Sequence, residues 1–516
     1  MRIRIFIVFA VLFSILWSTS CRKDFEYAPS EGHLSFSRDT VYLDTVFSQV
    51  GSSTYTLKVY NDTKDDIIIP TIALKNGTES FYRLNVDGVS GKEFNNTPIY
   101  AQDSLFVLIE TTIDITDDSI NELLYTDAIQ FDREPYQQTV ELVTLAKDAV
   151  FIFANNDKVS NKENIVLYID EQGNPIEVNG FNLQDDELNF TNDKAYVIYG
   201  YAIVPKDKEL VIDAGARVHF HKDSGLFINS EATLIVNGEL SNDEELLEGQ
   251  VIFEGDRLEP EFAEIPGQWD GIWIHAGSTN NSINHLTIKN AQIGLTIEGE
   301  SSEIENTLTI ENSWIYNNSS YNLWSKSSRI EAANLVLGGA GSASLLIENG
   351  GAYTFVHTTI ANYWNKGFRL NSALEIKNSL SNTRESGLDL IKADFKNCII
   401  DGNNQNELTL KPDNQDSFNY SFQNCFIKFS ADHISSDARS LYDFTNEDLF
   451  SEILLDGEVD YFLPARNDFR IGLGSIVIDK GNSNTANSAP LDIVGIQRLP
   501  TPDLGAFQAK EKEQSY

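Results

Sequence analysis

Six aromatic residues in the central part of the chain have the chemistry to stack on sugar rings. Aromatic side chains form such contacts when they are exposed on a flat surface, and they pack in the core when they point inward. The sequence favours packing in the core or at its rim and leaves glycan binding as the alternative. The candidates are Trp314, Tyr316, Tyr321, Trp324, Tyr363 and Trp364.

Two histidines could hold a metal ion if a third ligand joined them. His219 and His221 alternate with Val218 and Phe220, so both lie on one face of an expected strand. Zinc sites use three or four protein ligands, whereas the other histidines are scattered along the chain. We therefore predict no metal site at this pair and no cofactor.

Catalysis on glycans would need carboxylates or basic groups brought together. A hydrolase uses two carboxylates a few ångströms apart, which spacing in the sequence does not reveal. A lyase on acidic glycans needs calcium-binding carboxylates and an Arg or Lys base, but the basic residues between 282 and 390 keep no constant offset from an Asp cluster. Asp270, Asp479, Asp492 and Asp503 are expected in turns. We predict no catalytic residue.

The chain is strongly acidic, with 77 Asp and Glu against 38 Lys and Arg and a formal net charge of −39. Such a field repels phosphate backbones and polyanionic glycans, which argues against nucleic acid as a partner. The acids are dense in residues 243–264, where Arg257 is the only basic residue. A solvated loop is the favoured interpretation; a Ca²⁺ site or a partner epitope is the alternative.

Two of the three cysteines take the same place in matching phrases. Cys398 lies in Phe-Lys-Asn-Cys-Ile and Cys425 in Phe-Gln-Asn-Cys-Phe. On adjacent coils of a repeat they would be about 4.8 Å apart. That spacing suits a ladder of buried thiols at least as well as a disulfide, so both alternatives stay open.

Short strands position these residues. From Tyr196 onward, apolar strands alternate with Gly and Asn turns without a helical period. Asparagine tolerates the left-handed conformation and can hydrogen-bond along a stack, which suits a corner between two strand faces. Residues 195–475 would then form roughly 12 coils of a parallel β-helix. The corner residues recur at an average of about 23 residues and are His285, Asn312, Asn334, His357, Asn378, Asn397 and Asn424.

The phrases at both ends of this array resemble those of right-handed parallel β-helix repeat proteins of bacterial surfaces. Residues 210–220 and the phrase Gly-Gln-Trp-Asp-Gly at 267–271 match the usual beginning. The phrases at 474–481, 492–498 and 502–507 resemble the usual ending, so we expect a closing segment over residues 476–516. This resemblance implies an architecture far more than an activity. The sandwich described next and the C-terminal tail are expected to cover the ends of the array.

A first β domain precedes the array. Residues 34–150 contain short strands separated by turns such as Lys-Asn-Gly at 75–77 and Asp-Gly at 87–88, a spacing typical of a β-sandwich. Phrases at 51–52, 59–61, 81–86 and 103–105 resemble Ig-like domains of large bacterial surface proteins. That resemblance implies a spacer or a partner-binding module, joined to the array by residues 151–194.

The N-terminus has the layout of a signal peptide. Arg2 and Arg4 precede an apolar run over residues 5–17 and small residues at 18–20. The small residues before Cys21 resemble a bacterial lipobox, which implies that Cys21 is lipidated and begins the mature protein. Arg-Lys-Asp-Phe-Glu at 22–26 resembles an export tag to the outer face of the outer membrane. We predict a signal peptide at 1–20 and a tether at 21–33.

The sequence thus predicts an all-β protein, with an N-terminal Ig-like β-sandwich followed by a right-handed parallel β-helix. We expect an outer-membrane lipoprotein, exposed at the cell surface, whose β-helix binds a glycan or a surface protein without catalysis. Two alternatives remain. One is a carbohydrate-active enzyme, either a polysaccharide lyase or a glycoside hydrolase, and the other is a structural spacer.

Overall fold

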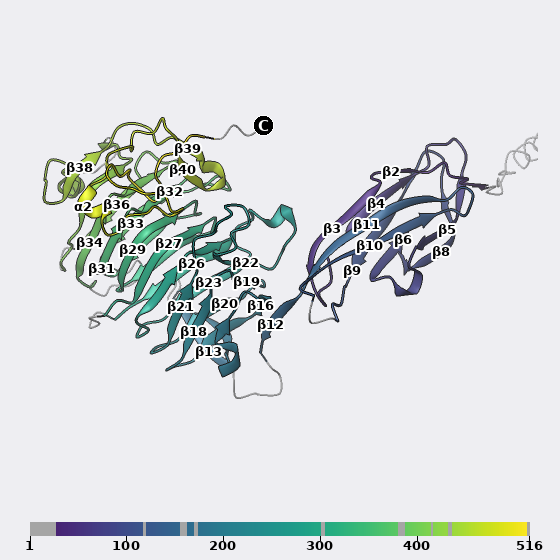
Figure 1. Ribbon diagram of the computed structural model, residues 1–516, viewed down its shortest axis with the longest axis horizontal. Helices are drawn as coiled ribbons and strands as arrows, with labels where there is room; N and C mark the ends of the chain where they lie inside the picture. The colour runs from purple at the N-terminus through teal and green to yellow at the C-terminus, as the bar shows by residue number, and fades with distance from the viewer. Residues whose placement is uncertain are drawn as a thin grey trace, which may run out of the picture. The chain divides into compact units, whose positions relative to one another are not determined.

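The computed structural model describes residues 27–116, 120–154, 162–169, 174–300, 305–379, 387–413, 416–431 and 436–512. The predicted signal peptide, Cys21 and the first part of the tether lie outside these ranges. The chain divides into two compact units, Met1–Asp148 and Ala149–Tyr516 (Figure 1). No helix in the described ranges combines the length and apolar character needed to span a bilayer.

The first unit is a sandwich of two mainly antiparallel sheets, with a 3-10 helix η1 (Gly77–Glu79) between β5 and β6. One sheet has six strands: β1 (Ala28–Pro29), β3 (Thr40–Phe47), β5 (Ile67–Leu74), β8 (Glu93–Ile99), β10 (Glu122–Phe131) and β11 (Gln138–Lys147). The other has five: β2 (Ser35–Phe36), β4 (Tyr55–Tyr60), β6 (Tyr82–Val86), β7 (Val89–Gly91) and β9 (Ser104–Thr111).

Buried apolar residues alternate with more exposed residues along the strands, and the buried ones form the core of the sandwich. In β9, Leu105, Val107 and Ile109 are buried and Phe106 is exposed, because successive side chains of a strand point to opposite faces. These residues belong to one apolar cluster that spans both sheets. The N-terminal β-sandwich predicted from the sequence is therefore present.

The second unit is a β-helix, in which all strand pairings of the two large sheets except β13–β14 are parallel. The ten-stranded sheet contains β13 (Lys162–Ile169), β14 (Pro175–Asn182), β17 (Tyr201–Val204), β20 (Gly225–Ile228), β23 (Trp269–Ile274), β26 (Ala291–Glu298), β28 (Tyr321–Lys326), β30 (Leu345–Glu348), β33 (Leu374–Lys377) and β36 (Leu408–Lys411).

The seventeen-stranded sheet runs around the other side of the coils. It contains β12 (Ala149–Phe153), β15 (Asn189–Phe190), β16 (Ala195–Tyr199), β18 (Glu209–Asp213), β19 (Arg217–Phe220), β21 (Thr233–Asn237), β22 (Val251–Gly255), β24 (Asn281–Asn284), β25 (Leu286–Lys289), β27 (Leu308–Tyr316), β29 (Arg329–Leu337), β31 (Gly351–Val356), β32 (Thr359–Asn362), β34 (Leu390–Lys396), β35 (Ile399–Gly402), β37 (Ser421–Ile427) and β38 (Phe450–Leu454).

Short elements complete the second unit: 3-10 helices η3 (Asp185–Glu187), η4 (Pro260–Phe262), η6 (Ser436–Tyr442) and η7 (Pro464–Arg466), the two-stranded sheet of β39 (Tyr461–Leu463) and β40 (Asp468–Ile471), and α2 (Ser483–Ala486). The all-β fold class predicted from the sequence is confirmed.

The ladder of corner residues predicted from the sequence lies where the strands of the seventeen-stranded sheet bend between two faces. Asn334 Nδ2 donates to Asn312 Oδ1 at 2.9 Å, and Asn312 Nδ2 donates to Asn284 Oδ1 at 2.9 Å. These amides link successive coils while the left-handed backbone turns the chain between two faces. Positive φ angles of 46° to 55° occur at His285, Asn312, Asn334, His357, Asn397 and Asn424.

Asn378 does not belong to this ladder, so that part of the prediction was wrong. Asn378 follows β33 in the ten-stranded sheet, whereas His357 and Asn397 occupy equivalent corners, since Thr359 pairs with Ile399. A long loop at residues 363–373 makes one coil look like two repeats. Within the described ranges, the ten-stranded sheet contains nine strands in parallel pairing, β13 being antiparallel.

Aromatic rings stack inside the last coils of the helix. Phe355, Phe395, Phe422 and Phe450 follow one another with centroid distances of 5.0, 4.8 and 5.5 Å and nearly parallel planes. In-register parallel strands put the same side-chain position one strand spacing apart. The stack therefore follows directly from the repeat.

Cys398 and Cys425 also occupy equivalent inward positions, because Ile399 pairs with Phe426. Both are free and buried in the core. Their Sγ atoms donate to the carbonyls of Phe355 and Phe395 at 3.5 and 3.4 Å. Of the two alternatives, the molecule has the thiol ladder.

The C-terminal tail packs along the outside of the coils, and its predicted place over the end was wrong. Phe507, Leu504 and Ile493 form an apolar cluster with outward residues of the seventeen-stranded sheet such as Val336 and Ile399. The last coils are instead covered by aromatic and aliphatic residues that precede the tail: Phe429, Leu441, Tyr442, Phe444 and Leu449.

Candidate functional site

The outer face of the ten-stranded sheet carries aromatic residues in register. Inward residues such as Leu323 and Ile347 belong to the apolar core, so their neighbours in the strands point outward. One outward column consists of residues that are β-partners on successive coils, and we call it the aromatic column. Its members are Ile203, Phe227, Trp273, Thr296, Trp324 and Leu346.

Charged residues form a second column two residues further along each strand, which we call the charge column. His275 Nδ1 lies 3.2 Å from Glu298 Oε2, and Lys326 Nζ lies 2.9 Å from Glu298 Oε1. Lys377 Nζ lies 3.2 Å from Glu348 Oε1. In-register strands bring side chains of successive coils close together. Neighbouring residues of opposite charge therefore attract one another in these pairs, whereas residues of like charge would repel.

The neighbouring charged groups keep Glu298 ionised. Burial disfavours the charged carboxylate of Glu298, but the hydrogen bonds and charges of His275 and Lys326 outweigh it and lower the pKa of Glu298. A carboxylate held in this way is a fixed hydrogen-bond acceptor at neutral pH.

Trp324 and Tyr321 connect the two columns. Their ring centroids are 5.5 Å apart, with planes tilted by 40°. Trp324 Nε1 donates to Glu348 Oε2 at 3.0 Å, and the Lys326 ammonium lies 4.0 Å from the centroid of the indole. Both rings are partly exposed. The indole is thus held in one orientation at the surface by a carboxylate and a cation.

Trp314, also a candidate from the sequence, lies under the C-terminal tail, and Tyr363, another candidate, lies under the β39–β40 segment that precedes the tail. Trp314 contacts Phe507 at a centroid distance of 6.4 Å, and Tyr363 contacts Tyr461 at 5.7 Å. Both rings pack against the apolar cluster that joins the tail to the coils. Both side chains therefore contribute to packing between the coils and the segments that cover them.

Tyr316 and Trp364 lie away from Tyr321 and Trp324. Tyr316 is the β-partner of Lys289 on the seventeen-stranded sheet, and burial raises the pKa of its hydroxyl. Trp364 lies close to Gly341, where an added Cβ would be 3.4 Å from its ring. Of the six candidates, the structure brings Tyr321 and Trp324 together on the outer face of the ten-stranded sheet.

Lys289 does not fit the role of a catalytic base. Its ammonium lies 2.8 Å from Glu254 Oε2. Burial alone would lower the pKa of Lys289, but Tyr316 and Glu254 outweigh it and raise the pKa. A base needs a lowered pKa to be neutral near pH 7, so this pair stabilises the sheet.

The two histidines have separate carboxylate partners. His219 Nδ1 lies 3.8 Å from Glu254 Oε1, and His221 Nδ1 lies 2.7 Å from Asp256 Oδ2. His221 also stacks on Tyr199 at 4.5 Å. In the described part of the chain, no group of three His, Cys, Asp or Glu residues has the arrangement to hold a metal ion.

Buried carboxylates elsewhere are committed to internal partners. Tyr363 donates to Asp401 Oδ2 at 2.8 Å, and Arg369 Nη2 lies 2.6 Å from Glu407 Oε1. Desolvation raises the pKa of both acids. Neither carboxylate is accessible, with Asp401 3% and Glu407 0% exposed, so a sugar could not reach them without rearrangement.

Asp270 lies inside β23 instead of in the expected turn. Its Oδ2 accepts a hydrogen bond from the Tyr201 hydroxyl at 2.6 Å, and burial raises its pKa. The aspartates of the tail do fix turns: Asp503 accepts from the backbone of Asp479 at 2.8 Å, and Asp492 accepts from the backbone of Ile496 at 2.7 Å.

The acidic stretch at 243–264 is a loop and strand with definite partners. Glu244 Oε2 lies 3.2 Å from Arg470 Nη1 and 3.3 Å from Lys510 Nζ, which ties the loop to the tail. Asp243 accepts from the backbone of Leu246 at 3.0 Å, and this bond lowers its pKa. The stretch is therefore partly a structural tie to the tail.

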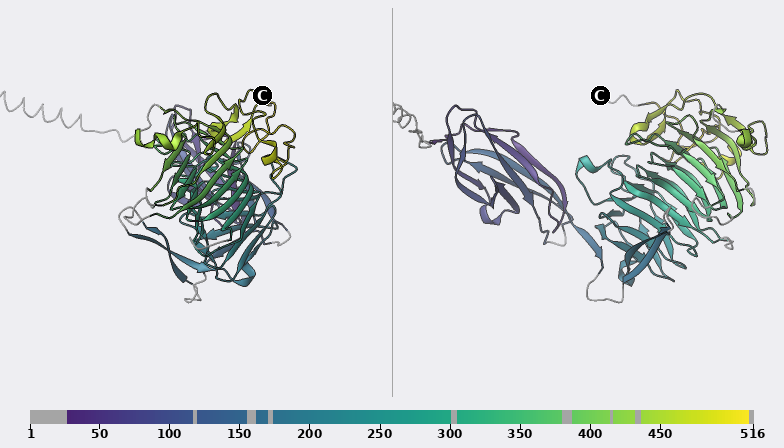
Figure 2. Two further views of the ribbon diagram at one scale, coloured as in Figure 1. Left: turned by 90° about the vertical axis from the view of Figure 1, so that its left-hand side faces the viewer. Right: turned by 180° about the vertical axis from the view of Figure 1, so that it is seen from behind.

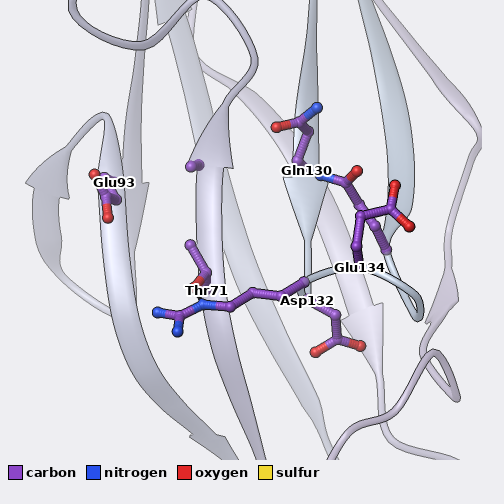
Figure 3. Close-up of a pocket in the computed structure, with 8 residues that line it drawn as sticks. Thr71, Glu93, Gln130, Asp132 and Glu134 are labelled. Atoms are coloured by element: carbon purple, nitrogen blue, oxygen red, sulfur yellow. Dashed lines mark hydrogen bonds between the residues drawn. The ribbon is translucent and has the colours of Figure 1, made fainter.

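The sandwich contains a surface cavity of about 310 Å³ (Figure 3). Arg133 lines the cavity, and its Nε donates to Thr71 Oγ1 at 2.8 Å. Asp132 accepts from Ser30 Oγ and from the Gly32 backbone N–H, so its carboxylate holds the 30–32 turn. Glu93 and Glu134 are well separated across the cavity. The polar side chains that line the cavity therefore have structural partners within the sandwich.

The charge column is accompanied by a weak sequence pattern. A triplet beginning with Leu precedes a charged residue in Leu-Thr-Ile-Glu298 and Leu-Leu-Ile-Glu348, and related phrases end at Lys326, Lys377 and Lys411. The same phrase, Leu-Thr-Ile-Glu, also occurs at 308–311 in β27 of the seventeen-stranded sheet, so the phrase alone does not assign the charges to one face.

A family model described as a right handed beta helix region matches residues 164–338, about a third of the chain. The match agrees with the parallel sheets and supports the right-handed β-helix predicted from the sequence. No curated protein matches the sequence.

Three solved structures are similar at low scores. A family 123 glycoside hydrolase from Clostridium perfringens, studied for glycolipid glycan hydrolysis, has 8% identity and a TM-score of 0.15; the match covers 22% of this chain and 26% of the enzyme, so the chain spans about a quarter of that protein's length. The PapD-like domain 7 of human CEP192 has 11% identity and a TM-score of 0.15, with 25% and 95% covered.

The third is the catalytic unit of a thermostable GH87 alpha-1,3-glucanase from Streptomyces thermodiastaticus strain HF3-3. It has 10% identity and a TM-score of 0.21, and the match covers 78% of this chain and 88% of the enzyme. Similarity at this level carries no activity from one protein to the other.

Proposed function

We propose that the protein is a lipoprotein of the bacterial outer membrane, anchored through Cys21 and exposed at the cell surface, whose β-helix binds a glycan without catalysis. The observation that carries the binding proposal is the arrangement of Trp324 and Tyr321. Both rings are partly exposed and stand beside a row of fixed charges.

This arrangement suits a sugar. Aromatic faces contact the C–H faces of sugar rings, while alternating carboxylates and ammonium groups can accept from and donate to hydroxyls. Glu348 and Lys326 already fix the indole, so binding would cost little ordering of Trp324. The net charge of −39 favours a neutral glycan over a polyanionic one.

The anchor proposal rests on the sequence alone. The basic start, the apolar run and the small residues before Cys21 support lipidation. Several acyl carbons at about 0.8 kcal/mol each would hold the chain at the membrane. Metabolic labelling with a tagged fatty acid tests this: we expect label on the wild type and none on Cys21→Ala. Protease treatment of whole cells then reports exposure at the surface.

A glycan array with the full-length protein in detergent tests the binding proposal. We expect neutral glycans to bind and Trp324→Ala to lose the signal. Phe106→Ala is a matched control, because Phe106 is an exposed ring in the sandwich with Lys58 4.9 Å from its centroid. Release of reducing or unsaturated sugars from a bound glycan would contradict the non-catalytic proposal. Binding to a surface protein alone would replace the glycan as partner.

A further inference from the structure

The β-hairpin formed by β13 and β14 is folded against the outer face of the ten-stranded sheet. β14 pairs with β17 only over Gly180–Asn182, and the hairpin extends beyond this contact. Ile165 and Leu167 of β13 are buried in one cluster with Ile203, Phe227 and Trp273 of the sheet. In the right-hand view of Figure 2 the hairpin crosses the first coils.

Glycine allows this close approach. A Cβ at Gly180 would lie 2.6 Å from Ile203 Cδ1 and 2.8 Å from Ile165 Cδ1. Since real contacts are longer, a larger residue at position 180 would push these two isoleucine side chains away from their present positions. The rest of the hairpin is a two-stranded ribbon held to the sheet through apolar side chains, a marginal structure by itself.

The hairpin cluster covers part of the aromatic column. Trp273 belongs to this cluster and is 1% exposed, although it points outward from the sheet. Thr296, its β-partner on the next coil, also points outward and is 0% exposed. Trp273 Nε1 and Thr296 Oγ1 are buried, and neither has a hydrogen-bond partner among the described residues. Burying a polar group without a partner is costly. The side chains that the hairpin places in this cluster, Ile165, Leu167 and Val178, offer no partner.

The covered residues continue the proposed binding surface. Thr296 is the β-partner of Trp324, and Trp273 is the β-partner of Thr296. Phe227 follows on the next coil and also contacts His275 of the charge column at 5.4 Å. The column therefore runs without a break from the partly exposed rings at Trp324 to the covered ring at Phe227.

We propose that the β13–β14 hairpin is a displaceable cover over an extended glycan site, and that a long unbranched neutral oligosaccharide displaces it. The ligand lies along the aromatic column, with sugar rings on Trp273 and Phe227 and hydroxyls bonded to Trp273 Nε1 and Thr296 Oγ1. A short sugar occupies only the Trp324 end. This inference rests on the proposed glycan binding.

The test compares short and long ligands on the full-length protein in detergent. Neutral gluco-, manno- and xylo-oligosaccharide series, from disaccharides to octasaccharides, are titrated by calorimetry. The double variant Ile165→Ser/Leu167→Ser removes the apolar contacts of the cover. If the wild-type cover is open about a tenth of the time, the variant binds octasaccharides about tenfold more tightly and disaccharides unchanged. Val166→Ser is the matched control, because Val166 lies on the exposed face of β13.

Adding Trp273→Ala to the double variant should cancel the gain for octasaccharides. An unchanged ratio of octasaccharide to disaccharide affinity in the double variant overturns the inference but leaves the proposed function intact. Absence of binding by every series overturns both.

Hydrogen exchange on the wild type gives a second readout that requires no variant. Bound octasaccharide should reduce protection of the amides of β14 N-terminal to Gly180, and bound disaccharide should not. Unchanged or increased protection with octasaccharide contradicts displacement of the hairpin.

Discussion

The ammonium of Lys326 lies 4.0 Å from the centre of the Trp324 ring, and the same ammonium pairs with Glu298 at 2.9 Å. One lysine therefore links the charge column to the aromatic column. The orientation of the indole depends on the ionisation of the residues around it.

Glu298→Gln should make the stability of the β-helix depend less on pH below neutrality. The pKa of Glu298 is lowered in the folded state, so its stabilising contribution is present above the ordinary value of 4.5 and is lost as the pH falls through the lowered pKa. We expect the urea midpoint of the β-helix to fall less between pH 7 and pH 3 in the variant than in the wild type. Glu231→Gln, at an exposed pair with Lys206 in the same unit, is the control. Equal acid sensitivity of wild type and Glu298→Gln would argue against this pairing.

Glu407→Gln should destabilise the β-helix strongly. Glu407 and Arg369 form a pair whose side chains are 0% and 3% exposed. Neutralising one partner leaves a buried guanidinium without its counter-ion, which costs about 3–5 kcal/mol. Glu231→Gln, which breaks an exposed pair with Lys206, should cost less than about 1 kcal/mol. Urea unfolding measures both, and similar small losses would mean that the buried pair is dispensable.

Arg498→Met should loosen the tail. Arg498 is 1% exposed, and its Nη2 donates to Asn334 Oδ1 at 2.8 Å and to the Ala506 carbonyl at 2.9 Å. Burial lowers the pKa of Arg498 to about 10, so the guanidinium stays charged near neutrality. Losing these bonds leaves buried acceptors unpaired, at about 1–3 kcal/mol. Limited proteolysis should cut the variant tail first. An intact tail in the variant would show that the apolar cluster alone holds it.

The buried thiols should be unreactive until the protein unfolds. Burial, with a further contribution from the neighbouring Cys398, raises the pKa of Cys425, which disfavours the reactive thiolate. We expect no modification of Cys398 or Cys425 by a maleimide in buffer and modification of both in denaturant without reductant. Modification in denaturant only after reduction would indicate a disulfide.

Local patterns predicted the repeat, because the corner residues must tolerate left-handed backbone at a fixed place in each coil. His285 and Asn312 could be recognised in this way. Asn378 misled the interpretation because it matches the repeat in sequence while belonging to another face, and only the pairing of Thr359 with Ile399 reveals the long coil.

The candidate site was less predictable for a different reason. Trp314 and Trp324 both point outward from their strands, and nothing local distinguishes them. Trp314 is covered by Phe507, which is far away in the sequence. Trp273 is likewise covered, by a hairpin that the sequence assigned to a connecting segment. Exposure depends on these long-range contacts.

The most direct test of the binding proposal is calorimetry of wild type and Trp324→Ala with the best neutral glycan from the array. Truncating a central aromatic contact should weaken binding by about 2 kcal/mol, which is about thirtyfold in Kd. Phe106→Ala should bind as the wild type does. Equal affinity of Trp324→Ala and the wild type would contradict the proposed site on the outer face of the ten-stranded sheet.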